Sequence, residues 1–144
     1  MVSALDVAEY ILQQTGVVTT MKLQKLVYYC QAWSLVWDEK PMFKEDIEAW
    51  ANGPVVRELY ESHKGQFDVP KGFIGGDTSK LIDEQKETID AVLTYYGLLT
   101  SQTLVNLTHA EDPWKDARKG IPETARSNNE ISLASMAEYY GSLG

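Results

Sequence analysis

Two histidines and one cysteine are the side chains of this sequence best suited to catalysis or metal binding. They are His63, His109 and Cys30. A structural zinc site needs four closely spaced Cys or His ligands, and covalent catalysis needs a nucleophile beside a base; neither pattern is present. His109 is followed by Glu111 and Asp112, but a histidine at a helix end more commonly bonds to the backbone. The sequence therefore predicts a protein that is not an enzyme and uses no metal or cofactor.

A polar ribbon runs along the most apolar segment of the chain. Gln24, Tyr28 and Gln31 have i, i+4, i+7 spacing, so a helix places them on one side. A buried amide group that lacks a partner costs about 1–3 kcal/mol, so this ribbon must meet specific partners. Two interpretations stay open. Either backbone groups of segment 45–54 bond to the ribbon, or it is the floor of a surface that binds another molecule.

Trp50 lies next to a turn of restricted conformation. Asn52, Gly53 and Pro54 follow it, and such a turn can present a tryptophan rigidly to a protein partner. We therefore predict a partner-binding surface on this turn and the neighbouring ribbon. Its predicted residues are Gln24, Tyr28, Gln31, Trp50, Asn52, Gly53, Pro54 and Val55.

These side chains must be positioned by a helix over residues 21–37, which is apolar on nearly all sides. Such a helix is normally surrounded by others. Apolar spacing and capping signals predict further helices. They lie between Ser3 and Gly16, from Pro54 to Gly65, over 82–96 with Gly97 as a left-handed cap, over 101–109, over 112–120, and over 133–140. The expected fold is mostly α: a single compact domain, residues 1–144, of about seven helices around helix 21–37, with at most a short β element near 42–50.

The composition of the chain indicates its cellular compartment and the class of molecule that it binds. The chain has 144 residues and a net charge of −8, which disfavours non-specific nucleic-acid binding and suits a protein partner. No segment approaches the roughly 18 apolar residues of a membrane span. A single cysteine cannot form an intramolecular disulfide, which is typical of a reducing compartment. We expect a cytoplasmic protein without a membrane partner.

Four segments, in order, resemble the Panacea domain family of SocA-like antitoxins and phage-associated proteins. They are Met21 to Trp33, Pro41 to Phe43, Ile47 to Trp50 with Gly53 to Val56, and Leu107 to His109 with Pro113 and Trp114. The similarity covers roughly residues 5–140. Cys30 departs from it, since a small residue such as alanine is expected there.

The resemblance implies an antitoxin from a bacterial or prophage toxin–antitoxin system that neutralises a cognate protein toxin by direct binding. It carries over no catalytic residues. Two alternatives stay open: an adaptor that delivers the toxin to a protease, and a DNA-binding repressor of its own operon. Lys115, Arg118, Lys119 and Arg126 cluster late in the chain, but a recognition-helix pattern is not evident, so nucleic-acid binding is disfavoured.

Overall fold

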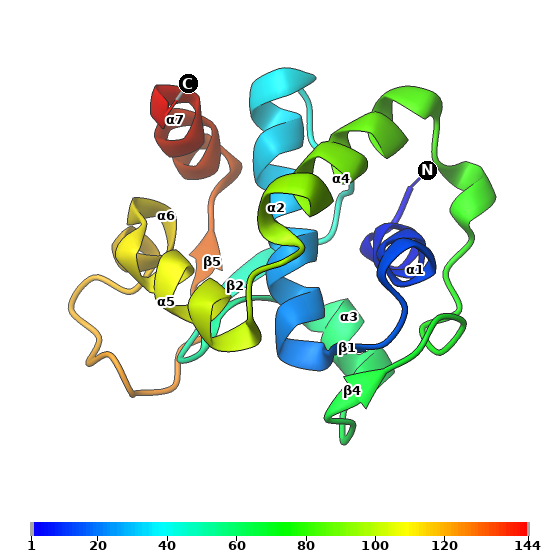
Figure 1. Cartoon of the computed structure of the whole chain (residues 1–144). Helices are drawn as coiled ribbons and strands as arrows, with labels where there is room; N and C mark the ends of the chain where they lie inside the picture. The colour runs from blue at the N-terminus through cyan, green and yellow to red at the C-terminus, as the bar shows by residue number, and fades with distance from the viewer. Residues whose placement is uncertain (1, 144) are drawn as a thin grey trace.

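Helix α2, Thr20–Trp37, passes through the middle of the computed structural model, which describes residues 2–143 (Figure 1). Thr19 caps it, because its hydroxyl accepts a 3.1 Å hydrogen bond from the Lys22 amide. Its side chains are buried on nearly every side, including Leu23, Leu26 and Tyr29. The predicted central helix is therefore confirmed, and burial all round explains its lack of a clear amphipathic face.

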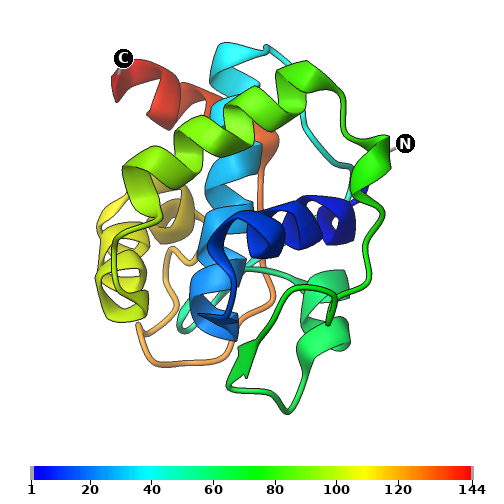
Figure 2. The ribbon, with the colours of Figure 1, turned by 45° about the vertical axis from the view of Figure 1, so that its right-hand side comes forward.

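Seven α-helices are present in residues 2–143, as expected. Besides α2 they are α1 (Ala4–Thr15), α3 (Arg57–His63), α4 (Asp83–Tyr96), α5 (Ser101–Ala110), α6 (Asp112–Ala117) and α7 (Leu133–Leu143), with a short 3-10 helix at Thr78–Lys80. Helices α1 and α3 lie on one side of α2 and α5 to α7 on the other, while α4 crosses it (Figures 1 and 2). The mostly α fold around a central helix is confirmed.

The short β element expected near 42–50 is strand β2, Ile47–Trp50. It pairs on both sides, which the sequence did not indicate. Strand β3, Gly53–Val56, and strand β5, Glu130–Ile131, flank it in an antiparallel sheet of order β3-β2-β5. A second pair joins β1, Val18–Thr19, to β4, Asp68–Val69.

Pro54 does not begin a helix, so that prediction is wrong. It lies in β3 opposite Ala49. The Ala49 amide points away from Pro54 and donates to the Asn129 carbonyl at 2.7 Å. The pair is therefore one whose backbone groups face outward, and the missing N–H of proline removes no bond between β2 and β3. Helix α3 begins only at Arg57.

Gly97 does not form the predicted left-handed cap either. Its φ and ψ are −64° and −24°, which is right-handed helical geometry. The chain continues from α4 through a turn into α5, whose N-cap is Thr100. The Gly97 carbonyl accepts a 2.6 Å bond from Lys22 Nζ. That bond satisfies a helix-end carbonyl without a left-handed residue.

Carboxylates of α1 hold the glycine-rich loop that follows β4. Glu9 accepts hydrogen bonds from the amides of Gly72 at 2.6 Å and Gly75 at 3.0 Å. Asp6 forms a capping box with Ser3 and also accepts from the Asp77 amide at 2.7 Å. The loop is thus tied to α1 by charge-assisted bonds.

Candidate functional site

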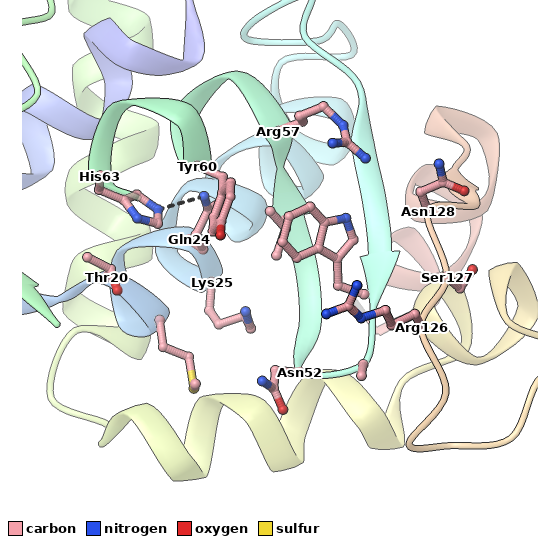
Figure 3. A pocket seen from close by; sticks show the side chains of 14 residues that line it. Thr20, Gln24, Lys25, Asn52, Arg57, Tyr60, His63, Arg126, Ser127 and Asn128 are labelled. Carbon is pink, nitrogen blue, oxygen red and sulfur yellow. Dashed lines mark hydrogen bonds between the residues drawn. The ribbon is translucent and has the colours of Figure 1, made fainter. Parts of the chain in front are cut away.

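A pocket of about 730 Å³ opens between the first turns of α2, the β2–β3 hairpin, α3 and segment 126–128 (Figure 3). It is lined by Thr20, Met21, Gln24, Lys25, Trp50, Ala51, Asn52, Val55, Arg57, Tyr60, His63, Arg126, Ser127 and Asn128. None of these fourteen residues is Asp or Glu. The absence matters because the whole chain has a net charge of −8.

Gln24 forms part of the floor and closes the open edge of β3. Its side-chain oxygen accepts from the Val56 amide at 2.9 Å, and its nitrogen donates to the Val56 carbonyl at 3.3 Å. The Gln24 amide thus binds as a neighbouring strand would. Its nitrogen also donates to His63 Nε2 at 3.0 Å. Burial lowers the pKa of His63, in agreement with an unprotonated Nε2.

Lys25 is buried beside Gln24. Its ammonium donates to the Pro54 carbonyl at 3.2 Å, and no carboxylate in residues 2–143 forms an ion pair with it. Burial lowers the pKa of Lys25 to about 7. Gly53 makes room for its stem: with φ of +116°, it lies where a Cβ would meet Lys25 Cε at 2.6 Å. The floor therefore holds an amine that is only partly protonated near pH 7 and that has no anionic partner among residues 2–143.

Trp50 is held firmly at the rim. Its indole Nε1 donates to Glu48 at 2.8 Å, and Glu48 also accepts two bonds from Arg57, at 3.0 and 2.8 Å. The Tyr60 ring lies edge-on, 4.9 Å from the Trp50 ring. Burial would raise the pKa of Glu48, but the bonds from Arg57 and Trp50 outweigh it and lower that pKa. The carboxylate therefore offsets the Arg57 charge and fixes the indole.

Segment 126–128 is brought to the pocket by Arg118. This side chain is buried, and it donates to the carbonyls of Pro122 at 2.9 Å, Glu123 at 3.1 Å and Ala125 at 2.6 Å. The bonds bend the chain after α6 so that Arg126 and Lys25 point toward one another across the pocket (Figure 3). Arg118 is therefore engaged inside the protein, not displayed for nucleic acid.

A family model described as antitoxin SocA-like, Panacea domain, matches residues 23–115. The chain belongs to the Panacea domain family. The match confirms the resemblance and contains α2 from Leu23 onward, the β2–β3 hairpin and α3, so most of the pocket lies within it. Segment 126–128 lies beyond its end. Neither a curated protein nor a solved structure was found to match the chain.

The Panacea domain brings four of the eight predicted surface residues together at the pocket: Gln24, Trp50, Asn52 and Val55. Gly53 and Pro54 are buried behind it, against Lys25. Tyr28 and Gln31 are buried elsewhere on α2 and do not line the pocket.

The internal partners of the ribbon differ from the expected 45–54 segment. Gln31 accepts from the amides of Met42 and Phe43 at 2.7 and 3.2 Å and donates to the Phe43 carbonyl at 2.8 Å. Tyr28 shares a 3.0 Å hydrogen bond with the Tyr140 hydroxyl. The ribbon therefore bonds to the chain just before β2, to the end of β3 and to α7.

Sequence reasoning missed the pocket's basic side chains, Lys25, Arg57 and Arg126. One signal was present for Lys25: a lysine inside a helix segment that is otherwise buried must point to a specific acceptor or cavity. Nothing local marked Arg126, which reaches the pocket only through the folding of the 118–126 segment.

Metal-binding clusters and membrane spans were also sought in residues 2–143. They hold no group of three or more His, Cys, Asp or Glu placed to bind a metal ion. None of the helices in that range has the length and apolarity needed to cross a membrane.

His109 stacks on Trp114 with ring centres 3.9 Å apart.

Proposed function

We propose that this Panacea domain protein is an antitoxin that binds a cognate protein toxin directly in the cytoplasm and thereby neutralises it. Membership of the SocA-like antitoxin family carries the proposal. On this proposal the protein acts as a binding module, without catalysis and without a cofactor. The family role implies a toxin partner but leaves the toxin's own activity open.

We place the toxin-binding surface at the rim of the pocket. Trp50 supports this location because Glu48 and Tyr60 hold its ring rigidly, so little side-chain entropy would be lost on binding. Asn52 is exposed beside it at the hairpin turn, whereas Val55 lines the pocket but is buried. An aromatic anchor beside a concave, hydrogen-bonding rim is a common arrangement of protein interfaces.

The antitoxin unit of this proposal is the whole chain, residues 1–144, as one domain. Helices α1 and α7 fall outside the family match, yet their residues Ile11 and Met136 belong to the same buried core as Leu26 of α2. Removing either helix would expose that core, so binding tests require the full chain rather than residues 23–115 alone.

The antitoxin role can be tested in cells with the reading frame adjacent to the gene. Its product is expressed in a bacterial host from an inducible promoter, with and without the full chain. We expect growth arrest by the neighbour alone, rescue on co-expression, and co-purification of the two proteins. A neighbour that is harmless, or one whose toxicity persists beside a well-expressed full chain, would contradict the role.

The proposed surface is tested separately with matched tryptophan variants. Trp50→Ala removes the rim anchor, while Trp37→Ala removes a tryptophan that is 48% exposed at the opposite end of α2. We expect Trp50→Ala to weaken toxin binding at least tenfold in calorimetry and Trp37→Ala to leave it unchanged. The opposite pattern would move the surface to the other end of α2 and leave the antitoxin role intact.

A further inference from the structure

The pocket is positively charged in an acidic protein. Lys25, Arg57 and Arg126 line it from three different elements, and none of its fourteen lining residues is acidic. Glu48 offsets Arg57, so the charge that is left without an ion pair among residues 2–143 is that of Arg126 and of the partly protonated Lys25. A concave site of one sign concentrates ligands of the opposite sign.

Lys25 makes the site unusual. A buried ammonium is costly unless an anion or several acceptors surround it, and within residues 2–143 this one has a single acceptor, the Pro54 carbonyl. The fold nevertheless makes room for it, because Gly53 leaves space that any side chain would fill. A stem so tightly accommodated, whose charged end faces a cavity, is the arrangement expected of a binding group.

The remaining lining suits a phosphate better than a carboxylate. Arg126 faces Lys25 from the other side of the pocket (Figure 3). Both are nitrogen donors of the kind that bind phosphate oxygens by charge-assisted hydrogen bonds. Ser127, Asn52 and Asn128 add hydroxyl and amide groups. The first turn of α2 also forms part of the wall through Thr20 and Met21, at the end of the helix where its dipole favours an anion.

The volume indicates a ligand larger than a bare ion. At about 730 Å³ the pocket lies within the range of roughly 300–1,000 Å³ typical of small-molecule sites. Trp50, Tyr60 and Met21 supply aromatic and apolar surface beside the charged groups. We propose that this pocket binds a small phosphate-bearing molecule of about mononucleotide size, with its phosphate between Lys25 and Arg126 and its remainder against Trp50 and Met21.

Binding should be coupled to uptake of a proton by Lys25. Its pKa of about 7 rises when a phosphate lies beside it, so more of the ligand-bound protein is protonated between pH 7 and 9. The other charged or titratable groups near it are His63 on α3, His109 on α5, Arg57 and Arg126. Burial lowers the pKa of both histidines from its ordinary value of 6.5, so it is loss of the Lys25 proton that should lower the affinity as pH rises from 7 to 9.

The test is calorimetry with purified full-length protein and AMP, GMP, CMP and UMP, the four matching nucleosides, inorganic phosphate and poly-glutamate. We expect at least one mononucleotide to bind, with a nucleoside and phosphate each at least tenfold weaker. Titrations in two buffers of different ionisation enthalpy at pH 8 should reveal proton uptake. Lys25→Met and Arg126→Gln should each weaken binding at least tenfold, whereas Lys80→Met, on the exposed 3-10 helix, should not.

Several results would overturn the proposal. One is the absence of nucleotide binding at millimolar concentration; another is binding that both Lys25→Met and Arg126→Gln leave unchanged. Arg126 is exposed on a loop, so its variant remains informative even if Lys25→Met fails to fold. Binding of poly-glutamate in place of nucleotides would assign the pocket to acidic peptides instead. The proposal does not depend on the antitoxin role, because these measurements use the isolated protein.

Discussion

Gly53 and Lys25 are packed so closely that a side chain on residue 53 would displace the end of the lysine. A Cβ on Gly53 would lie 2.6 Å from Lys25 Cε and 3.0 Å from the Thr108 hydroxyl oxygen. The same glycine adopts φ of +116°, in the region that favours glycine. The β2–β3 hairpin and the pocket floor are therefore specified by the same residue.

We predict that Gly53→Ala destabilises the protein by about 2–4 kcal/mol, the sum of backbone strain and displacement of the lysine. Urea unfolding at pH 7 measures the change. Gly65→Ala is the matched control, because Gly65 also has a positive φ, +89°, but no atom within 4 Å of the added Cβ. Gly65→Ala should lower the free energy of unfolding by the backbone strain alone, about 1–2 kcal/mol. Equal losses for the two variants would mean that the contact with Lys25 costs nothing.

Lys25 also predicts a pH dependence of stability. Its pKa is lowered from 10.5 to about 7 by burial, so between these values the unfolded chain binds more protons than the folded one. The free energy of unfolding should therefore rise with pH across this window, by at most about 1.4 kcal/mol per pH unit. Lys25→Met removes this contribution.

The measurement compares urea unfolding of wild type and Lys25→Met from pH 6.5 to 9.5. Burial raises the pKa of Cys30, which adds an opposite slope in the alkaline range, but both proteins contain it and the difference cancels it. We expect the wild type to gain stability relative to the variant as pH rises. Parallel curves would show that the buried lysine has an ordinary pKa.

The central helix and the order of the elements could be predicted because their signals are local. Leu23, Leu26 and Tyr29 belong to a segment apolar on all sides, and hydroxyl side chains cap α1 at Ser3 and α2 at Thr19. The prediction of a helix start at Pro54 was wrong because proline is equally compatible with a helix start and with an outward-facing position in an edge strand. Only the partner strand decides between them, and that information is not local.

Part of the pocket could be predicted from local sequence signals, and part of it could not. Gln24 and Trp50 stand out in sequence, as an amide in an apolar helix and a tryptophan beside a turn. Arg126 is about a hundred residues away from Lys25 in the chain, and Arg118 brings it close by bonding to backbone carbonyls. Carbonyl acceptors leave no trace in the side-chain sequence, so this contact could not be foreseen.

Gln31 provides a test of the internal half of the polar ribbon. Its amide satisfies two amides and one carbonyl of Met42 and Phe43, all buried. We predict that Gln31→Leu costs at least about 2 kcal/mol, since these groups would lose their partners. Gln102→Leu, an exposed glutamine bonded to Asn106, should change stability by less than about 0.5 kcal/mol. Urea unfolding of both variants measures the change in the free energy of unfolding. If Gln31→Leu lowers it no more than Gln102→Leu does, the backbone groups of residues 42–43 must find other partners.

Glu111 predicts a second pH dependence, of opposite sign. Its carboxylate is buried and accepts 2.7 Å hydrogen bonds from Tyr29 and Tyr140. Burial raises the pKa of Glu111, and the two tyrosine bonds only partly oppose this. Between the ordinary value of 4.5 and the raised value, the folded protein binds more protons than the unfolded chain. Its contribution to stability should therefore be fully present below about pH 4.5 and be lost as pH rises through that window.

Glu111→Gln isolates this effect, because a neutral amide oxygen still accepts from both tyrosines while its charge no longer changes with pH. Urea unfolding of both proteins from pH 4 to 8 should show the wild type losing stability relative to the variant as pH rises, with the difference levelling off above the raised pKa. The carboxylates whose pKa values are lowered, such as Glu48 and Asp77, are shared and cancel in the difference. A wild type that instead gains relative stability would mean that the tyrosine bonds outweigh burial, and that Glu111 is held as a stable carboxylate in the core.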